Sequence, residues 1–165
     1  MREKLFSDVE GLRIAMEIEA RGMAFYQKAY EHAQKPEHKD LFLFLKHEEV
    51  AHYEAFKSMY EQIKAQDGSQ DTEYLFDQES SRYLTVLAEG HVFPASDTAA
   101  TAVAKMDSLE EVLKLALQAE KDSILFYDEL ARQSKFEKAK KIFSKLKEEE
   151  QTHVVKLREI IKGWA

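Results

Sequence analysis

Two stretches of the sequence, 101 positions apart, carry one pattern: FLFLKHEEVAH at residues 42–52 and FSKLKEEEQTH at residues 143–153. Each stretch places apolar residues at helical spacing and then sets Glu-x-x-His on the same stripe. Residues three and four apart lie on one face of an α-helix, so each stretch predicts a helix whose inward face turns polar midway. A buried carboxylate and imidazole one turn apart require a compensating partner.

The repeat extends well beyond these stretches. A shift of 101 positions, without any gap, superposes these pairs: Ser7 and Ser108, Glu10 and Glu111, Glu19 and Glu120, Tyr26 and Tyr127, Phe42 and Phe143. Self-similarity over so long a segment indicates a duplicated structural unit. The unit is long enough for a helical hairpin.

Helical periodicity covers four segments, at about residues 8–33, 38–65, 109–133 and 136–162. The first and third begin at Ser-x-x-Glu capping boxes, and the fourth is expected to stop at Gly163. Short connections within each half predict two antiparallel hairpins. We therefore expect an all-α four-helix bundle that forms a single domain over residues 1–165.

A long crossover, at about residues 66–107, joins the two hairpins. If the second and third helices run parallel, the chain must return along the whole bundle, about 39 Å for a helix of roughly 26 residues. Residues 78–87 have the pattern of a short helix, which we expect to lie across the bundle. His91 is interpreted as a surface or packing residue.

Six polar residues interrupt the otherwise apolar stripes: Glu19, Glu49, His52, Glu120, Glu150 and His153. Unpaired carboxylates in a core cost several kcal/mol each, and no Lys or Arg occupies the stripes near this level. The two glutamates of each hairpin are centred on residues 34 and 135, in the predicted turns, so they should face each other. Two divalent cations would balance the four carboxylates. The alternative, a solvated glutamate face with ordinary core histidines, is disfavoured because the pattern occurs twice at one phase.

This residue set resembles the di-iron carboxylate proteins of the ferritin-like superfamily. The rubrerythrin branch is the most similar, through the Phe25-Tyr26 pair and the doubled Glu48-Glu49 and Glu149-Glu150. The resemblance covers all four helices but not the crossover. It implies a ferritin-like fold and a metal centre of two iron ions per chain, with manganese or a mixed site as the alternative.

The resemblance also implies a role for each of the six residues. They would be divided between the metals in this way: Glu49 and Glu150 bridge both irons, Glu19 and His52 complete one, and Glu120 and His153 complete the other. Beyond these metal ligands no catalytic residue is predicted. Tyr26 and Tyr127, seven residues after the two terminal glutamates, are expected to hydrogen-bond ligand carboxylates, with simple core packing as the alternative.

Two departures from rubrerythrins concern electron supply and symmetry. The sequence contains no cysteine and therefore no cysteine-ligated rubredoxin unit, so we expect electrons to come from a separate, unidentified donor protein. Many rubrerythrins resemble this bundle but carry a further glutamate on the third helix. Here the flanking positions are Leu117 and Ser123, which favours a symmetric site.

The composition of the chain argues against several classes of protein. The net charge of −7, from 24 basic and 31 acidic residues, disfavours a nucleic-acid partner. No apolar run is long enough for a membrane span, and the first residues lack a signal core, so we expect a cytoplasmic protein. A homodimer is the expected assembly.

The favoured function is reduction of hydrogen peroxide to water by the di-iron site. A ferroxidase that oxidises Fe(II) with dioxygen is the first alternative. A metal-binding bundle without catalysis is the second, and a manganese catalase is disfavoured because those enzymes are usually larger. All of these stay open at the level of sequence.

Overall fold

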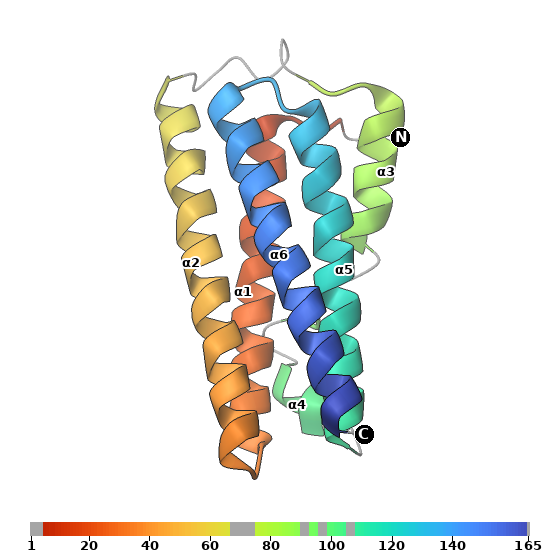
Figure 1. The fold of residues 1–165 in the computed structure, drawn as a ribbon. Helices are drawn as coiled ribbons and strands as arrows, with labels where there is room; N and C mark the ends of the chain where they lie inside the picture. The colour runs from red at the N-terminus through yellow and green to blue at the C-terminus, as the bar shows by residue number, and fades with distance from the viewer. Residues whose placement is uncertain (1–4, 67–74, 90–92, 96–98, 105–107, 165) are drawn as a thin grey trace.

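The computed structural model describes residues 5–66, 75–89, 93–95, 99–104 and 108–164. Within these ranges the chain forms helices and no strand: α1 (Asp8–His32), α2 (Pro36–Gln66), α3 (Gln78–Glu89), α4 (Ala99–Ala104), α5 (Leu109–Gln133) and α6 (Glu137–Trp164). The four long helices form a bundle, which confirms the all-α prediction (Figure 1). No helix in the described part of the chain combines the length and the apolar character that a membrane span requires.

The bundle consists of two antiparallel hairpins, α1 with α2 and α5 with α6 (Figure 1). Helices α2 and α5 point the same way, so the crossover returns along the bundle. The prediction that its short helix lies across the bundle was wrong, because α3 runs alongside α5. Backbone contacts near its start explain this: Phe6 N–H donates to Ser81 Oγ (2.9 Å) and Phe76 N–H donates to Phe6 O (2.8 Å). These bonds fix the start of α3 beside the start of α1.

The crossover contains a second helix, α4, which packs against α1 and was not predicted. Its sequence, AATAVA, spans fewer than two turns and is too short to show a helical period. His91 lies outside the described residues. The crossover also carries Phe93, which is buried against Phe25 and Tyr26 of α1.

The capping residues in the sequence predicted most of the helix ends correctly. The hydroxyls of Ser7 and Ser108 each accept a hydrogen bond from the backbone N–H three residues on. Helix α2 begins at Pro36 rather than near residue 38, because proline suits a first turn whose N–H has no helical partner. Helix α6 continues through Gly163 to Trp164, so the predicted stop at Gly163 was wrong.

Aromatic and aliphatic side chains fill the bundle above and below its middle. Along the inward face of α2 these side chains are all buried: Phe42, Leu45, Glu49, His52, Phe56, Met59 and Ile63. Rings meet across the helices, for example Phe56 with Tyr127 (5.1 Å between centroids) and with Phe143 (5.6 Å). Aromatic pairs at such separations add to the stabilisation that burial provides.

A buried carboxylate ties the two hairpins together at one end. Asp8, in the first turn of α1, is 1% exposed and accepts hydrogen bonds from the backbone N–H groups of Lys135 (3.0 Å) and Phe136 (2.9 Å). Both amides lie in the turn between α5 and α6, directly before the first residue of α6. Asp8 of the first hairpin therefore caps the N-terminus of α6 in the second hairpin.

Asp8→Ala should lower the free energy of unfolding by about 1–2 kcal/mol, because two partly buried amides lose their acceptor and α6 loses its cap. Urea unfolding followed by circular dichroism measures the change. Asp40→Ala, at an exposed position of α2, is the matched control and should change stability little. An equal effect of both substitutions would contradict the role of Asp8 as a cap.

Candidate metal centre

Four carboxylates and two imidazoles are buried together at mid-height in the bundle. All six predicted residues are at most 2% exposed, although they belong to the most polar residue types. Each long helix contributes: Glu19 from α1, Glu49 and His52 from α2, Glu120 from α5, and Glu150 and His153 from α6. The bundle thus brings together every residue of the predicted set.

The six side chains form two overlapping groups that could each hold a metal ion. One group is Glu19, Glu49, His52 and Glu150, and the other is Glu49, Glu120, Glu150 and His153; within each, the potential ligand atoms lie within 4.8 Å of one another. Glu49 and Glu150 belong to both groups, which is the arrangement required of bridging carboxylates. The two imidazole rings lie nearly parallel, 5.7 Å apart.

The hydrogen bonding of the cluster is incomplete without cations. In the part of the chain that the structure describes, every buried side-chain nitrogen or oxygen atom that lacks a hydrogen-bond partner belongs to these six residues. His52 Nδ1, for example, lies 2.7 Å from Glu150 Oε1 and 3.6 Å from Glu19 Oε2 without a hydrogen bond of good geometry. Native proteins leave few buried polar atoms unpaired. Converging lone pairs of carboxylate and imidazole fit iron or manganese.

Proximity also shifts the proton affinities of the cluster. Burial, reinforced by the charges of Glu19 and Glu150, raises the pKa of Glu49 well above its usual value. Burial alone would lower the pKa of His52, but the facing carboxylates of Glu150 and Glu19 outweigh it and raise that pKa to about 11. In the metal-free protein the neighbouring carboxylates therefore favour the protonated form of His52.

Two tyrosines hold ligand carboxylates across the hairpins. The hydroxyl of Tyr26 on α1 donates to Glu120 Oε1 (2.8 Å), and the hydroxyl of Tyr127 on α5 donates to Glu19 Oε1 (2.6 Å). Burial raises the pKa of both phenols well above 10, so they remain protonated donors. Each hairpin thus orients the terminal glutamate of the other.

A further pair of glutamates, not recognised in the sequence, faces the outer edges of the imidazoles. Glu149 Oε2 lies 2.7 Å from His52 Nε2, and Glu48 Oε1 lies 3.6 Å from His153 Nε2. Because Nδ1 of each ring faces the cluster, Nε2 is free to carry the proton and to donate it outward. A carboxylate at that position fixes ring orientation and increases ligand basicity. The doubled glutamates in both repeats were the available signal.

Gly22 and Phe93 also shape the site and were missed. A Cβ on Gly22 would lie 2.9 Å from Glu49 Oε2 and 3.1 Å from the Phe93 ring, so glycine permits this close packing. Phe93 belongs to the crossover and lies outside the repeat. Ser123, which occupies the equivalent position on α5, donates to Ala119 O (3.0 Å) and is buried. Neither Ser123 nor the buried Leu117 adds a carboxylate.

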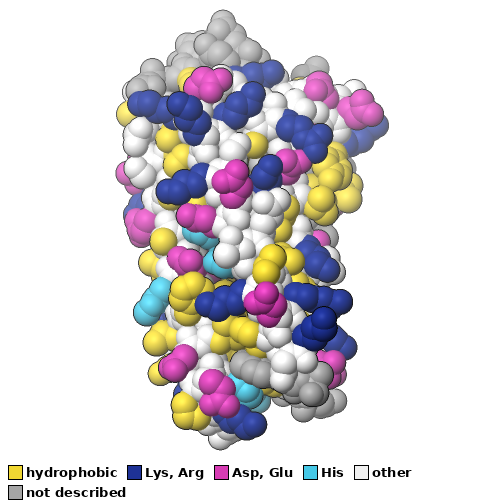
Figure 2. All heavy atoms as spheres, viewed as in Figure 1, with side chains coloured by type: hydrophobic (Ala, Val, Ile, Leu, Met, Phe, Trp, Pro, Cys, Tyr) yellow, Lys and Arg dark blue, Asp and Glu magenta, His cyan; other side chains and the backbone are white. Residues whose placement is uncertain are grey.

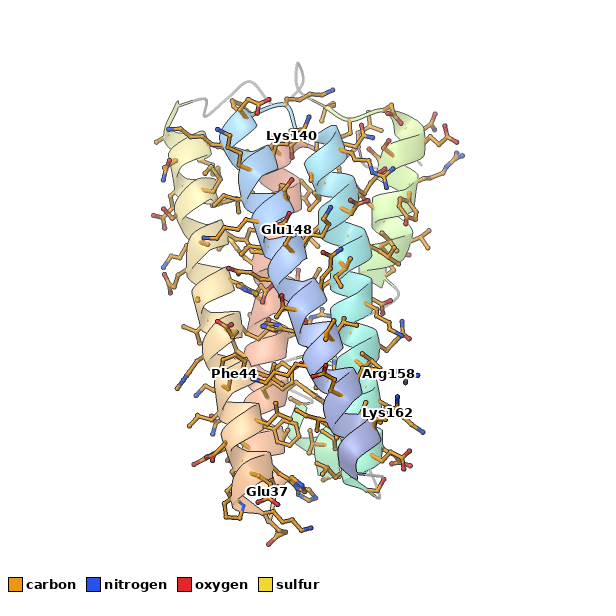
Figure 3. The ribbon with its side chains drawn as sticks, in the orientation of Figure 1. Glu37, Phe44, Lys140, Glu148, Arg158 and Lys162 are labelled. Atoms are coloured by element: carbon orange, nitrogen blue, oxygen red, sulfur yellow. The ribbon has the colours of Figure 1, made fainter. Side chains whose placement is uncertain are left out.

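Glu149→Gln should weaken Fe(II) binding by about tenfold or more, because His52 loses its charged acceptor. A chelator competition titration under anaerobic conditions measures the affinity. Glu148→Gln removes a neighbouring exposed carboxylate on the same helix and should leave the affinity unchanged (Figure 3). Equal affinities for wild type and Glu149→Gln would show that the contact does not support the ligand.

Metal binding at neutral pH should release protons, since His52 has a pKa of about 11 in the metal-free protein and must lose its proton to become a ligand. The affinity for Fe(II) should accordingly rise as pH increases. An indicator dye in weakly buffered, anaerobic solution measures the released protons. His47→Gln, at an exposed position of α2, should release the same number, and an absence of proton release from wild type would contradict the assignment.

Comparison with known proteins places this geometry in context. Residues 72–161, just over half of the chain, match the Rubrerythrin family model. A solved structure from Thermotoga maritima, provisionally described as a ferritin-like diiron-carboxylate protein, is 27% identical with a TM-score of 0.73, covering 99% of this chain and 100% of that one. Comparison with curated proteins gives no match. The family match includes Glu120, Glu150 and His153, and the internal repeat supplies their three counterparts. The chain therefore belongs to the rubrerythrin family.

Proposed function

We propose that the protein is a di-iron oxidoreductase that reduces hydrogen peroxide to water with electrons from an external donor protein. The observation that carries the proposal is the pair of overlapping buried ligand groups, which share Glu49 and Glu150. Membership of the rubrerythrin family supports iron as the metal. The absence of cysteine from this sequence supports a separate electron donor.

The proposed reaction combines one hydrogen peroxide, two electrons and two protons to give two waters. When bound at this site, two redox-active irons would supply one electron each to the peroxide. Glu49 and Glu150 would hold both metals, and Glu19 with His52 and Glu120 with His153 would complete the two positions.

The residues around the cluster keep it rigid and dry. Tyr26 and Tyr127 retain their protons and hold the terminal carboxylates by hydrogen bonds, so these ligands keep their places when charge changes. Phe93 closes one side, where its ring packs on Tyr26 at 5.5 Å. Fixed donors in an enclosed site act more strongly than the same groups would in water.

The electron donor is proposed to approach the face formed by α2 and α6. Phe44 and Val155 are exposed there, and Lys156 Nζ lies 3.8 Å above the Phe44 ring. Figure 2 shows hydrophobic side chains beside basic ones on the lower half of this face. The ring of Phe44 meets the ring of His153 edge-on at 6.4 Å, so a donor docked here is one ring away from a proposed metal ligand.

Stopped-flow oxidation of the anaerobic Fe(II)-loaded protein tests the reaction. We expect hydrogen peroxide to oxidise the protein much faster than dioxygen, with saturation at two irons per chain. Comparable or faster oxidation by dioxygen, continuing as Fe(II) is added, would instead establish a ferroxidase and overturn the peroxidase proposal.

Glu49→Ala tests whether the centre is catalytic at all. Loss of a carboxylate shared by both metal positions should abolish the fast oxidation phase in the same stopped-flow assay. Glu54→Ala, at an exposed position of the same helix, is the control and should react like wild type. Unchanged oxidation in Glu49→Ala, with altered stability only, would favour a metal-binding bundle without catalysis.

A further inference from the structure

A cavity of about 270 Å³ lies at the lower end of the bundle, where α1 turns into α2 and α5 begins (Figure 1). Ala29, Phe42, Val103 and Val112 form apolar walls, and Lys35 stands among the polar lining residues. Phe42 precedes Glu49 by two helical turns, about 10 Å along α2, so the cavity is separate from the metal centre. At about 30 Å³ for each small group, the volume has room for roughly nine heavy atoms.

The internal repeat shows how the side chains around this space differ between the two halves. At the equivalent place in the other half, Leu130 occupies the position of Ala29, and its side chain lies so close to Gly11 that a Cβ there would meet it at 2.6 Å. In the first hairpin Ala29 replaces Leu130, while Val112 replaces Gly11, so the larger side chain of the pair comes from the opposite helix. A cavity nevertheless remains at this junction in the first half, beside Ala29, Leu109 and Val112.

The same comparison shows which chemical group is missing. In the other half, the Asp8 carboxylate accepts hydrogen bonds from the backbone N–H groups of Lys135 and Phe136. The repeat places Leu109 where Asp8 stands, and it places Gln34 and Lys35 where those two amides stand. Leu109 cannot accept a hydrogen bond. Among the described residues, neither the Gln34 nor the Lys35 backbone N–H has an acceptor.

The charges of the residues that line the cavity also favour a carboxylate. Lys35 contributes a positive charge, and no Asp or Glu is found among the described lining residues. The cavity also lies beside Ser108, which caps the N-terminus of α5, and such ends attract negative charge. An anion with an apolar chain would match both the polar edge and the apolar walls.

We propose that this cavity binds a small monocarboxylate of about six carbons in all, whose carboxylate takes the place that Asp8 fills in the other half. The head group accepts from the Gln34 and Lys35 amides and pairs with the Lys35 ammonium group. The chain packs on Ala29, Phe42 and Val112. The proposal is independent of the proposed peroxidase activity, because it needs neither metal nor electron donor.

Isothermal titration of the full-length protein with hexanoate tests this site. We expect saturable binding of hexanoate, at least tenfold weaker binding of the neutral hexanamide, and weak binding of acetate, which has the head group without the chain. Absence of hexanoate binding overturns the proposal. Equal binding of hexanamide and hexanoate overturns the carboxylate assignment.

Two variants locate the binding in the cavity. Ala29→Leu places a larger side chain in the wall of the cavity, and Leu109→Asp provides an internal carboxylate in the place of Asp8; each should weaken hexanoate binding at least tenfold. Ala51→Leu, at an exposed position of α2, is the matched control and should bind like wild type. Circular dichroism identifies the variants that remain folded. Undiminished binding in either folded cavity variant contradicts this location.

Discussion

The burial of four carboxylates and two imidazoles at one level of a helical bundle is the constraint on which the rest of the structure depends. Ionised groups of this kind are expensive to remove from water, and their mutual repulsion adds to the cost. The protein supplies only partial compensation, through the hydroxyls of Tyr26 and Tyr127 and through the contact between Glu149 and His52. The unpartnered atoms that remain all point to the same solution, bound cations.

Duplication explains how a chain of this size builds such a cluster. Each hairpin provides one helix with a terminal glutamate and one with Glu-x-x-His, and the tyrosine of each hairpin binds the glutamate of the other. The repeat is visible away from the centre as well: Lys46 donates to Gln27, and Lys147, its counterpart, donates to Asp128. Those two contacts lie within one hairpin each, whereas the tyrosine–glutamate contacts cross between hairpins, so neither half can complete the centre alone.

The two halves have nevertheless diverged in the surroundings of the site. Gly22 corresponds to Ser123, and only the glycine has to accommodate the crossover residue Phe93. The outer contacts of the imidazoles differ as well, 2.7 Å for His52 with Glu149 and 3.6 Å for His153 with Glu48. The sequence favours a symmetric site in its ligands, whereas the structure shows unequal surroundings.

The sequence by itself determined the four long helices, the pairing of the hairpins and the six polar residues that meet, because helical period, capping and repeat spacing are local properties. It placed Glu19 level with Glu49 from their distances to the turn alone. The course of α3, the existence of α4, the insertion of Phe93 and the contact of Glu149 with His52 were decided only by the tertiary structure. Each depends on residues far apart in the chain, such as Phe6 with Ser81, whose approach is set by packing between hairpins and has no periodic signature.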